Sequence, residues 1–314
     1  MKQNGKELQV IEILSGNRVA MQGAERTQGV GYAGKQKKKH RGIQVGGRKR
    51  GEGLRTVVRV LFLTVSILFL AYVVLVGVLL YRQKHPTQVD FDKLEESRTT
   101  LWTGVLGGGA DLEKKMQELV ERNEETKDFV ENYENRQDYM GKEIDLSGDV
   151  REGEVPLLMQ WDKRWGYESF GDSNIGLAGC GPTCLSMAYL YFTGDLEGNP
   201  REIARYCEVN GYYTTEGTSW ELWTVGAKAF GLEGAELPLD ENRMKSALEA
   251  GKLIVCSMRP GDFTTTGHYI LLIGCDEEGF MVNDPNRRSN SEKHWEYDTL
   301  RGQIRNLWEI TKAP

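Results

Sequence analysis

One cysteine, one histidine and one aspartate are placed in this sequence where they could act as nucleophile, base and orienting acid. Cys180 lies in AGCGPTC (178–184), between two glycines and just before Pro182, a residue suited to the first turn of a helix. Unpaired N–H groups and the dipole at a helix start stabilise a thiolate, which is the attacking form of a thiol. Cys180 is therefore predicted to be a nucleophile, although a small residue at a tight turn is the plainer interpretation. Cys184, one helical turn further, is predicted to lie in the core.

His268 is predicted to be the base, because a carboxylate can orient its ring. A hairpin turn is predicted near Asp276, and both His268 and Asp284 lie eight residues from it, so the two are predicted to face each other across the strand pair. An aspartate in that position fixes the imidazole tautomer and stabilises the charged ring. Of the four histidines, only His268 and His294 lie beyond the N-terminal tail and the membrane-proximal region, and only His268 is predicted to have such a carboxylate.

Negative charge that develops on a carbonyl oxygen during thiol attack needs hydrogen-bond donors. The backbone N–H of Cys180 can supply one donor if a helix starts there. A side-chain amide can supply another, and Gln160 in VPLLMQWDKRWGY (155–167) is predicted to do so. Spacing alone supports an exposed structural amide at this position equally well.

The elements that must position these residues are helices followed by strands. Helices are predicted over 182–192, 200–210, 219–230 and 241–250, and strands over 253–257, 269–273 and 280–283. Thr218, followed three residues later by Glu221, has the pattern of a capping box at the start of the third helix. This order of elements indicates an α+β domain with an antiparallel sheet.

An apolar stretch near the N-terminus predicts a membrane span. Residues 60–81 contain no charge over 22 positions, which gives a helix of roughly 33 Å, long enough to cross a bilayer. Ten Lys and Arg residues lie within 25 residues before the stretch, and four lie within 20 residues after it. Because basic residues stay in the cytoplasm, the N-terminus is predicted to be cytoplasmic and the C-terminal part extracellular. Residues 1–59 are predicted to form a disordered basic tail that contacts lipid head groups, with nucleic acid as the alternative partner.

Beyond the span, a heptad pattern runs through residues 112–140 and includes Leu112, Met116, Leu119, Val130 and Met140. It predicts a helical stalk that could form a homodimer. An amphipathic helix that packs on its own domain fits the pattern at least as well, because three of the nine seam positions are polar.

Charge and cysteine content narrow the classes of function. The net charge of −6 combines 14 Lys/Arg and 4 Asp/Glu in residues 1–59 with 26 Lys/Arg and 42 Asp/Glu in residues 60–314. An acidic C-terminal part argues against nucleic acid as its partner, since affinity for phosphates comes mainly from Lys and Arg. The spacing of the five cysteines matches neither a zinc site nor a small disulfide scaffold.

Five segments in the C-terminal half resemble the papain-like cysteine peptidases related to the bacteriocin-processing double-glycine peptidases, cysteine peptidase family thirty-nine. They are VPLLMQWDKRWGY (155–167), AGCGPTCLSMAYLYFTGD (178–195), GTSW (217–220), PGDFTTTGHYILLIG (260–274) and VNDPNRRSNS (282–291). The resemblance implies a papain-like fold over 151–314, with Cys180 as nucleophile, His268 as base, Asp284 as orienting acid and Gln160 as oxyanion donor. Residues 82–150 are then an extracellular linker and stalk. Leader-cleaving relatives carry a transporter and a Gln much closer to the Cys, and no Walker motif occurs here.

The predicted function is hydrolysis of peptide bonds through an acyl-enzyme by a single-pass membrane protein on a bacterial cell surface, with a peptide or protein as substrate and no metal or organic cofactor. Cleavage of cell-wall peptide cross-links or amides is one alternative. A catalytically silent peptide-binding module is another, and a membrane anchor with a functional basic tail is a third.

Overall fold

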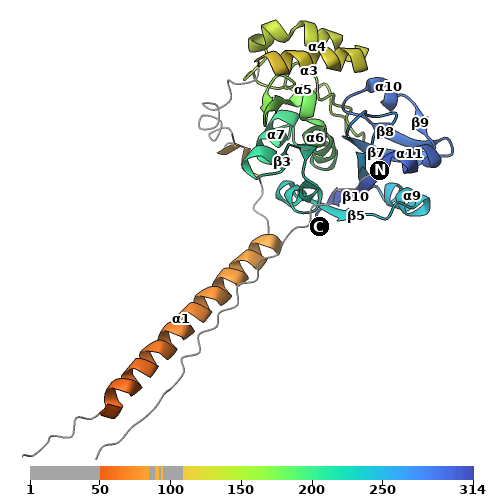
Figure 1. Ribbon diagram of the computed structural model, residues 1–314. Coiled ribbons are helices and arrows are strands. Elements are labelled where there is room, and N and C mark those ends of the chain that lie inside the picture. The colour runs from red at the N-terminus through yellow and green to blue at the C-terminus, as the bar shows by residue number, and fades with distance from the viewer. Residues whose placement is uncertain (1–49, 85–88, 92, 95–108, 216) are drawn as a thin grey trace, which may run out of the picture. The chain divides into compact units, whose positions relative to one another are not determined.

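The computed structural model describes residues 50–84, 89–91, 93–94, 109–215 and 217–314 (Figure 1). The described residues divide into two units, one ending at Val65 and one beginning at Ser66. The predicted disordered tail falls mostly on residues 1–49, outside the described residues. Its last part is corrected, because residues 50–59 belong to a helix.

That helix, α1 (Arg50–Lys84), is 35 residues long and covers the predicted span. Its most apolar stretch, Val57–Gly77, has a mean hydropathy of 2.7, and none of it is buried by other parts of the protein. Large apolar side chains such as Phe62 and Leu68 are about two-thirds or more exposed. By length and composition, the helix can cross a membrane.

The elements of the C-terminal half mix short helices with strands. They are β1 (Ser169–Phe170), β2 (Ser173–Asn174), α5 (Ile175–Ala178), α6 (Cys180–Thr193), α7 (Pro200–Val209), β3 (Tyr213–Thr214), β4 (Gly217–Thr218), α8 (Glu221–Thr224), η3 (Gly226–Phe230), β5 (Leu232–Glu236), α9 (Glu241–Glu249), β6 (Leu253–Met258), β7 (His268–Asp276), β8 (Gly279–Asn283), α10 (Arg288–Ser291), β9 (His294–Trp295), α11 (Tyr297–Gln303) and β10 (Ile304–Lys312). Helices 182–192, 200–210 and 241–250 and all three predicted strands are therefore confirmed within a few residues.

Six of the strands form one antiparallel sheet in the order β5-β10-β6-β7-β8-β9. Both faces of the central strands are covered, so all six residues of β6 are buried. Leu253 and Val255 point to the core shared with α6, α7 and α8, whereas Ile254 and Cys256 point to a second core shared with α9 and α11. The alternation follows from the two-residue period of a strand. The sheet thus has helices on both sides, and α6 packs on β7 (Figure 1).

The predicted helix 219–230 is corrected. A single turn, α8, is followed by the 3-10 turn η3, and the break lies at two β-branched residues, Thr224 and Val225. The capping box is also absent, because Thr218 belongs to β4 and Trp220 precedes α8 without a side-chain cap.

The predicted continuous stalk over 112–140 is likewise corrected. The segment contains α3 (Gly109–Arg122), η1 (Glu124–Thr126), α4 (Lys127–Glu131) and η2 (Tyr133–Asp138), and Asn123 interrupts the helix. Met116 and Phe129 are buried against Tyr167 of the C-terminal half. The alternative of an amphipathic element packed on its own domain therefore describes this segment.

Residues of the predicted linker also join the core. Val89 and Phe91 pack against the first core, Leu94 is buried in it, and the N–H of Val89 donates to the carbonyl of Ala229 at 2.8 Å. The compact unit therefore extends well before residue 151, the predicted domain boundary.

Candidate active site

Cys180 is the first residue of α6, at a crowded junction with α5 and β4. A Cβ atom on Gly179 would lie 2.4 Å from Ile175 Cγ2, and one on Gly181 would lie 2.4 Å from Thr218 Oγ1. Glycine on both sides therefore lets the helix start fit against its neighbours. The thiol itself is half-buried and free.

His268 begins β7 and Asp284 directly follows β8. Their side chains meet, with His268 Nε2 and Asp284 Oδ1 2.7 Å apart. The predicted direct pairing is wrong in detail, because the ladder pairs Leu271 with Asn283 and contains a bulge between Leu272 and Gly274. This register is offset by two residues from the one that would set His268 opposite Asp284, so the carboxylate reaches the ring diagonally.

The Asp284 carboxylate is fully buried and accepts several hydrogen bonds besides the one to His268. Oδ1 accepts from the backbone N–H groups of Asn286 and Arg287 at 2.8 and 3.2 Å, and Oδ2 accepts from Asn290 Nδ2 at 2.7 Å. Burial alone would raise the pKa of Asp284. His268 and these donors outweigh burial and hold the pKa below its usual 3.8.

The charge of His268 depends on the same contact. Burial alone would lower the pKa of the ring, but Asp284 and, to a smaller extent, the Cys180 thiol raise it to about 10. The ring is therefore protonated on both nitrogens and positively charged at neutral pH. Because Nε2 is bonded to Asp284, Nδ1 is the nitrogen left to face the thiol.

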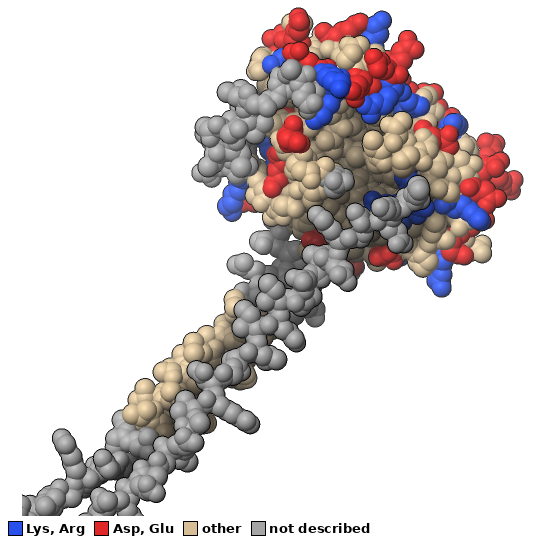
Figure 2. All heavy atoms as spheres, viewed as in Figure 1, with Lys and Arg blue, Asp and Glu red and all other residues tan. Residues whose placement is uncertain are grey.

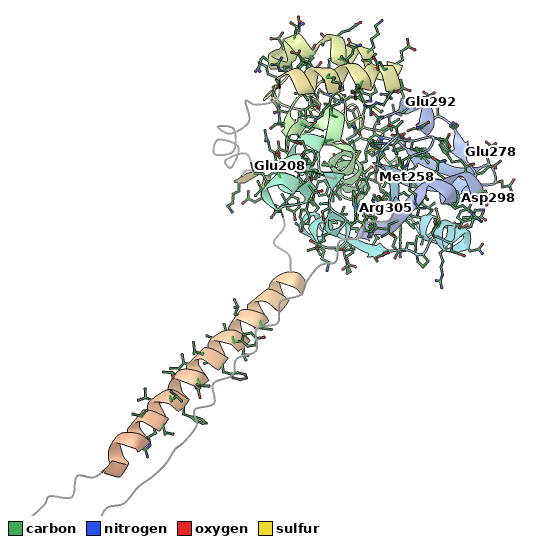
Figure 3. All side chains as sticks on the ribbon, in the orientation of Figure 1. Glu208, Met258, Glu278, Glu292, Asp298 and Arg305 are labelled. Carbon is green, nitrogen blue, oxygen red and sulfur yellow. The ribbon has the colours of Figure 1, made fainter. Side chains whose placement is uncertain are left out.

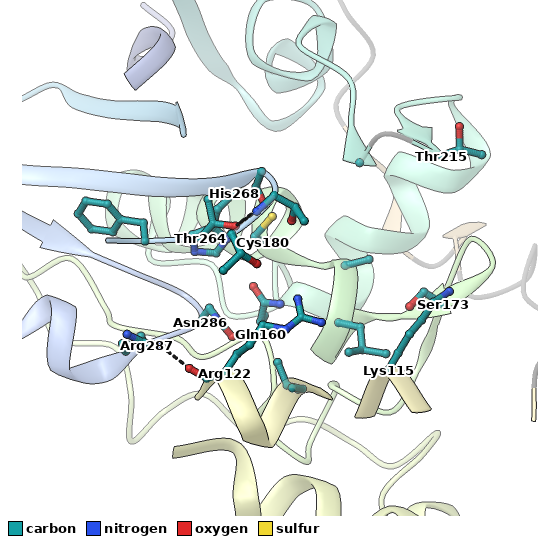
Figure 4. A pocket seen from close by; sticks show the side chains of 18 of the residues that line it. Lys115, Arg122, Gln160, Ser173, Cys180, Thr215, Thr264, His268, Asn286 and Arg287 are labelled. Carbon is teal, nitrogen blue, oxygen red and sulfur yellow. Dashed lines mark hydrogen bonds between the residues drawn. The ribbon is translucent and has the colours of Figure 1, made fainter. Parts of the chain in front are cut away.

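A cleft runs past these residues on both sides. One hollow of about 760 Å³ and another of about 670 Å³ are both lined by Cys180 and His268. Figure 4 shows the sulfur of Cys180 beside the His268 ring, with Gln160 across the first hollow. A chain segment bound along the cleft would therefore pass the thiol rather than end at it.

Gln160 lies in this first hollow, and its side chain is almost fully buried. Its Nε2 donates to the carbonyl of Gly176 at 2.9 Å, and its Oε1 has no hydrogen-bond partner among the described residues. Its backbone N–H donates to the carbonyl of Pro285 at 2.7 Å. The amide thus lines the same hollow as the Cys180 thiol, with one of its two N–H bonds engaged.

The other histidine behaves differently from the prediction. His294 does have carboxylates nearby, since its Nε2 lies 3.0 Å from Asp276 Oδ2 and its Nδ1 lies 3.5 Å from Glu278 Oε2. These groups surround the hairpin turn and line neither hollow. Proximity to the thiol, not the presence of a carboxylate, distinguishes the two histidines.

Cys184 is fully buried, as predicted, and its Sγ donates to the carbonyl of Tyr269 at 3.5 Å. Burial raises the pKa of this thiol well above its usual value. All five cysteines lie in the described part of the chain and are free.

Several contributors to the site escape sequence reasoning. Asn290 supports Asp284, and Lys115, Leu119 and Arg122 of α3 line the first hollow. Asn290 lies within the segment VNDPNRRSNS (282–291), which could have drawn attention to it. Nothing in the local sequence of α3 indicates a cleft wall.

A thiol at a helix start beside a histidine–aspartate pair is the arrangement that thiol-dependent hydrolases use. Comparison with known families assigns the chain more closely: the Peptidase_C39 like family matches residues 152–314, just over half of the sequence. The chain belongs to this family. No curated protein matches it.

Two solved structures are similar to parts of the chain. The peptidase domain of Streptococcus ComA, described as a bi-functional ABC transporter involved in a quorum sensing pathway, is 17% identical, with 44% of this chain and 92% of that chain covered and a TM-score of 0.33. A protein from Bacillus anthracis, described as a C39-like peptidase, is 16% identical, with 50% and 94% covered and the same TM-score of 0.33.

Proposed function

We propose that this protein is a membrane-anchored cysteine peptidase that cleaves peptide bonds outside the cell, with Cys180 as nucleophile, His268 as base and Asp284 as orienting acid. The observation that carries the proposal is the buried His268–Asp284 hydrogen bond of 2.7 Å in a cleft that Cys180 also lines. Family membership supports a peptide as the substrate.

In the first half of the reaction, the Cys180 sulfur attacks the carbonyl carbon of the scissile bond. A new S–C bond forms, and the carbonyl π electrons move to oxygen. His268 holds the thiol proton on Nδ1 and gives it to the amine when the C–N bond breaks. Asp284 stabilises the charged ring and keeps Nε2 protonated.

In the second half, water attacks the thioester carbonyl while His268 Nδ1 takes one of its protons. The S–C bond breaks, the carboxylic acid leaves, and the proton returns to sulfur. The oxygen that becomes negative in each half is stabilised by the Cys180 backbone N–H and by the free N–H of the Gln160 amide.

The arrangement of elements supports a papain-like architecture, in which a thiol-bearing helix packs beside an antiparallel sheet that carries the histidine. The basic residues that precede α1 support a cytoplasmic N-terminus, which would place the catalytic unit outside the cell. Contact with lipid would involve residues 60–81.

The thiol can be tested without a known substrate. Cys180 and Cys275 are both half-buried and free, so Cys275 is a matched control. Brief treatment with iodoacetamide at neutral pH, followed by peptide mapping, should label Cys180 faster than Cys275. Equal labelling of the two thiols would contradict the proposal.

The activity is tested with a random peptide library and, separately, with purified peptidoglycan. The wild-type protein should cleave one of them, Cys180→Ala should lose that cleavage, and Cys275→Ala should keep it. Cleavage of peptidoglycan alone would assign the activity to cell-wall peptides.

A further inference from the structure

Residues 109–140, the accessory segment, lie before the region that matches the family, yet they pack tightly on the catalytic unit. The Phe129 ring stacks on Tyr167 with centroids 4.4 Å apart, and the Tyr167 hydroxyl donates to the Phe129 carbonyl at 2.7 Å. The ring also fills space left by a glycine: a Cβ atom on Gly176 would lie 2.4 Å from Phe129 Cζ. The carbonyl of Gly176 is the one that holds the Gln160 amide.

The accessory segment also holds residues 284–289, the aspartate loop. Asn123 Nδ2 donates to the carbonyl of Asn286 at 2.5 Å, and the Arg287 guanidinium donates to the carbonyl of Arg122 at 2.5 Å. The bond from Arg287 to Arg122 is drawn in Figure 4. The two parts of the chain are therefore joined by polar contacts as well as by apolar packing.

A single carboxylate makes the largest number of these contacts. Glu125 accepts hydrogen bonds from the backbone N–H groups of Arg288 at 2.7 Å and Ser289 at 3.1 Å, and from the Ser289 hydroxyl at 2.8 Å. Hydrogen bonds to an ionised acceptor are the stronger kind. Glu125 therefore holds the backbone at Arg288 and Ser289, directly after the two residues whose N–H groups donate to Asp284.

The two sets of hydrogen bonds share one loop. The N–H groups of Asn286 and Arg287 donate to the Asp284 carboxylate. The accessory segment binds the carbonyl of Asn286 and the N–H groups of Arg288 and Ser289. We propose that the accessory segment, through Glu125 and Asn123, holds the aspartate loop in the geometry that orients His268, which makes Glu125 a positioning residue for the reaction. The inference rests on the proposed function.

The test compares Glu125→Ala and Glu125→Gln in the full-length protein. Glu125→Ala should lower kcat on the order of tenfold and change KM less, because a loosened loop misplaces the acid that orients His268, while most residues that line the cleft lie outside the loop. Glu125→Gln should recover part of the loss, because its amide oxygen still accepts from N–H groups. Glu124→Ala is the matched control, since this neighbouring glutamate is exposed.

The rate of Cys180 alkylation gives a second readout that needs no substrate. It should fall in Glu125→Ala and stay unchanged in Glu124→Ala. Wild-type kcat and alkylation in Glu125→Ala, together with an inactive Cys180→Ala, would overturn this inference and leave the proposed function standing. If the wild-type protein cleaves nothing but Glu125→Ala still slows alkylation, the proposed function fails and the role of Glu125 in positioning the loop stands.

A different observation concerns the second hollow, whose charge is opposite to that of the surrounding domain. Residues 152–314 contain 15 Lys/Arg and 25 Asp/Glu, and Figure 2 shows acidic side chains gathered at the outer edge of this half, where Figure 3 labels Glu278, Glu292 and Asp298. Among the residues that the structure describes, the hollow itself is lined by Arg259 and Arg305 and by no Asp or Glu.

The two guanidinium groups lie in the open part of the cleft. Arg259 and Arg305 are exposed, and neither forms an ion pair with any described residue. Arg305 lies over the ring of Trp220, 5.2 Å from its centroid, and Trp220 is 40% exposed. The hollow thus offers two cations and an aromatic face beside Cys180.

We infer that the second hollow binds a carboxylate side chain of the peptide substrate, a Glu or Asp next to the scissile bond, with the adjoining substrate atoms on Trp220. Guanidinium groups favour carboxylates through paired hydrogen bonds. This inference names the substrate class and also rests on the proposed function.

Binding to the inactive Cys180→Ala protein provides the test. Calorimetry would use a cleaved peptide with Glu near the scissile bond, its Gln counterpart, and versions with an amidated C-terminus. The Glu peptide should bind on the order of tenfold more tightly than the Gln peptide, and amidation should not matter. Loss of affinity on amidation alone would assign the carboxylate to the chain terminus.

Charge reversal supplies the control. Arg305→Glu should remove the preference for Glu over Gln, whereas Arg301→Glu, outside both hollows, should keep it. Equal binding of the Glu and Gln peptides to the Cys180→Ala protein would overturn the inference. That result leaves the cleavage of peptides by the wild-type protein intact.

Discussion

The protonation of one buried ring is controlled by one buried carboxylate. His268 has a pKa of about 10 against an ordinary 6.5, so the ring is charged from neutral pH up to about pH 10. Asp284→Asn removes the charge that outweighs burial, and the pKa of His268 should fall. The high-pH limb of kcat/KM should therefore move from near pH 10 to a lower pH, as measured by initial rates across pH. An unchanged limb would show that another group sets it.

The same pKa difference makes stability depend on pH. A folded-state pKa above the unfolded value means that the folded protein binds the extra proton, so this stabilisation is complete below pH 6.5 and is lost as pH rises through about 10. Thermal unfolding of the wild type should show a falling melting temperature over this window. Asp284→Asn should show a smaller fall, which separates this contribution from general alkaline denaturation.

Gly181, next to the proposed nucleophile, leaves no room for a larger side chain because Thr218 lies against it. A Cβ atom on Gly181 would lie within 3.0 Å of three Thr218 side-chain atoms, so Gly181→Ala should cost about 1–3 kcal/mol of stability and lower activity by shifting Cys180. Gly302→Ala in α11, where nothing lies within 4 Å, is the control. Chemical denaturation measures both variants. Recovery in Gly181→Ala combined with Thr218→Gly would confirm the contact as the cause.

At this scale, sequence analysis brings Cys180, His268, Asp284 and Gln160 to one place, and the structure does the same. Chemical type and chain order point to Cys180, His268 and Asp284, whereas spacing leaves Gln160 open and the family resemblance singles it out. They do not reveal that the Gln160 amide bonds Gly176, or that His294 has acidic neighbours of its own. Those contacts depend on register and loop path, which residue types do not determine.

Among the elements, the accessory segment depends most on one aromatic ring. Phe129 is 1% exposed, so Phe129→Ala should lower the free energy of unfolding by about 3–5 kcal/mol. Lys127→Ala, two residues away on the same element with a 61% exposed side chain, should change it little. Urea denaturation followed by tryptophan fluorescence would compare them. Similar midpoints for the two variants would contradict tight docking of the segment.

Elements with one clear periodicity are predictable, and elements fixed by tertiary contacts are not. The apolar residues of 182–192 predict a helix, and the apolar runs of β6 and β7 predict strands. By contrast, β5 and β10 pair with each other far along the chain, and β9 has only two residues, so local pattern misses all three. The heptad of 112–140 fails as a stalk because Asn123 bonds the aspartate loop rather than continuing a helix.

For the whole molecule, the order of charge along the chain predicts its orientation in the membrane. All five cysteines follow the apolar helix, so a membrane-impermeant maleimide added to intact cells should label the protein through Cys180 and Cys275. Ser15→Cys in a variant without those two thiols should be labelled only after permeabilisation. Labelling of Ser15→Cys in intact cells would reverse the proposed orientation.

The order of contacts along the chain after α1 has a mechanical consequence. Three residues attach this part of the chain to the first core: Val89 through its hydrogen bond to Ala229, Phe91 through an edge contact with the Tyr189 ring, and Leu94 through burial. If α1 is held by a bilayer, tension along the chain reaches these contacts before it reaches residue 109. The core would take up a pull from the membrane, and the wall of the cleft would be shielded from strain.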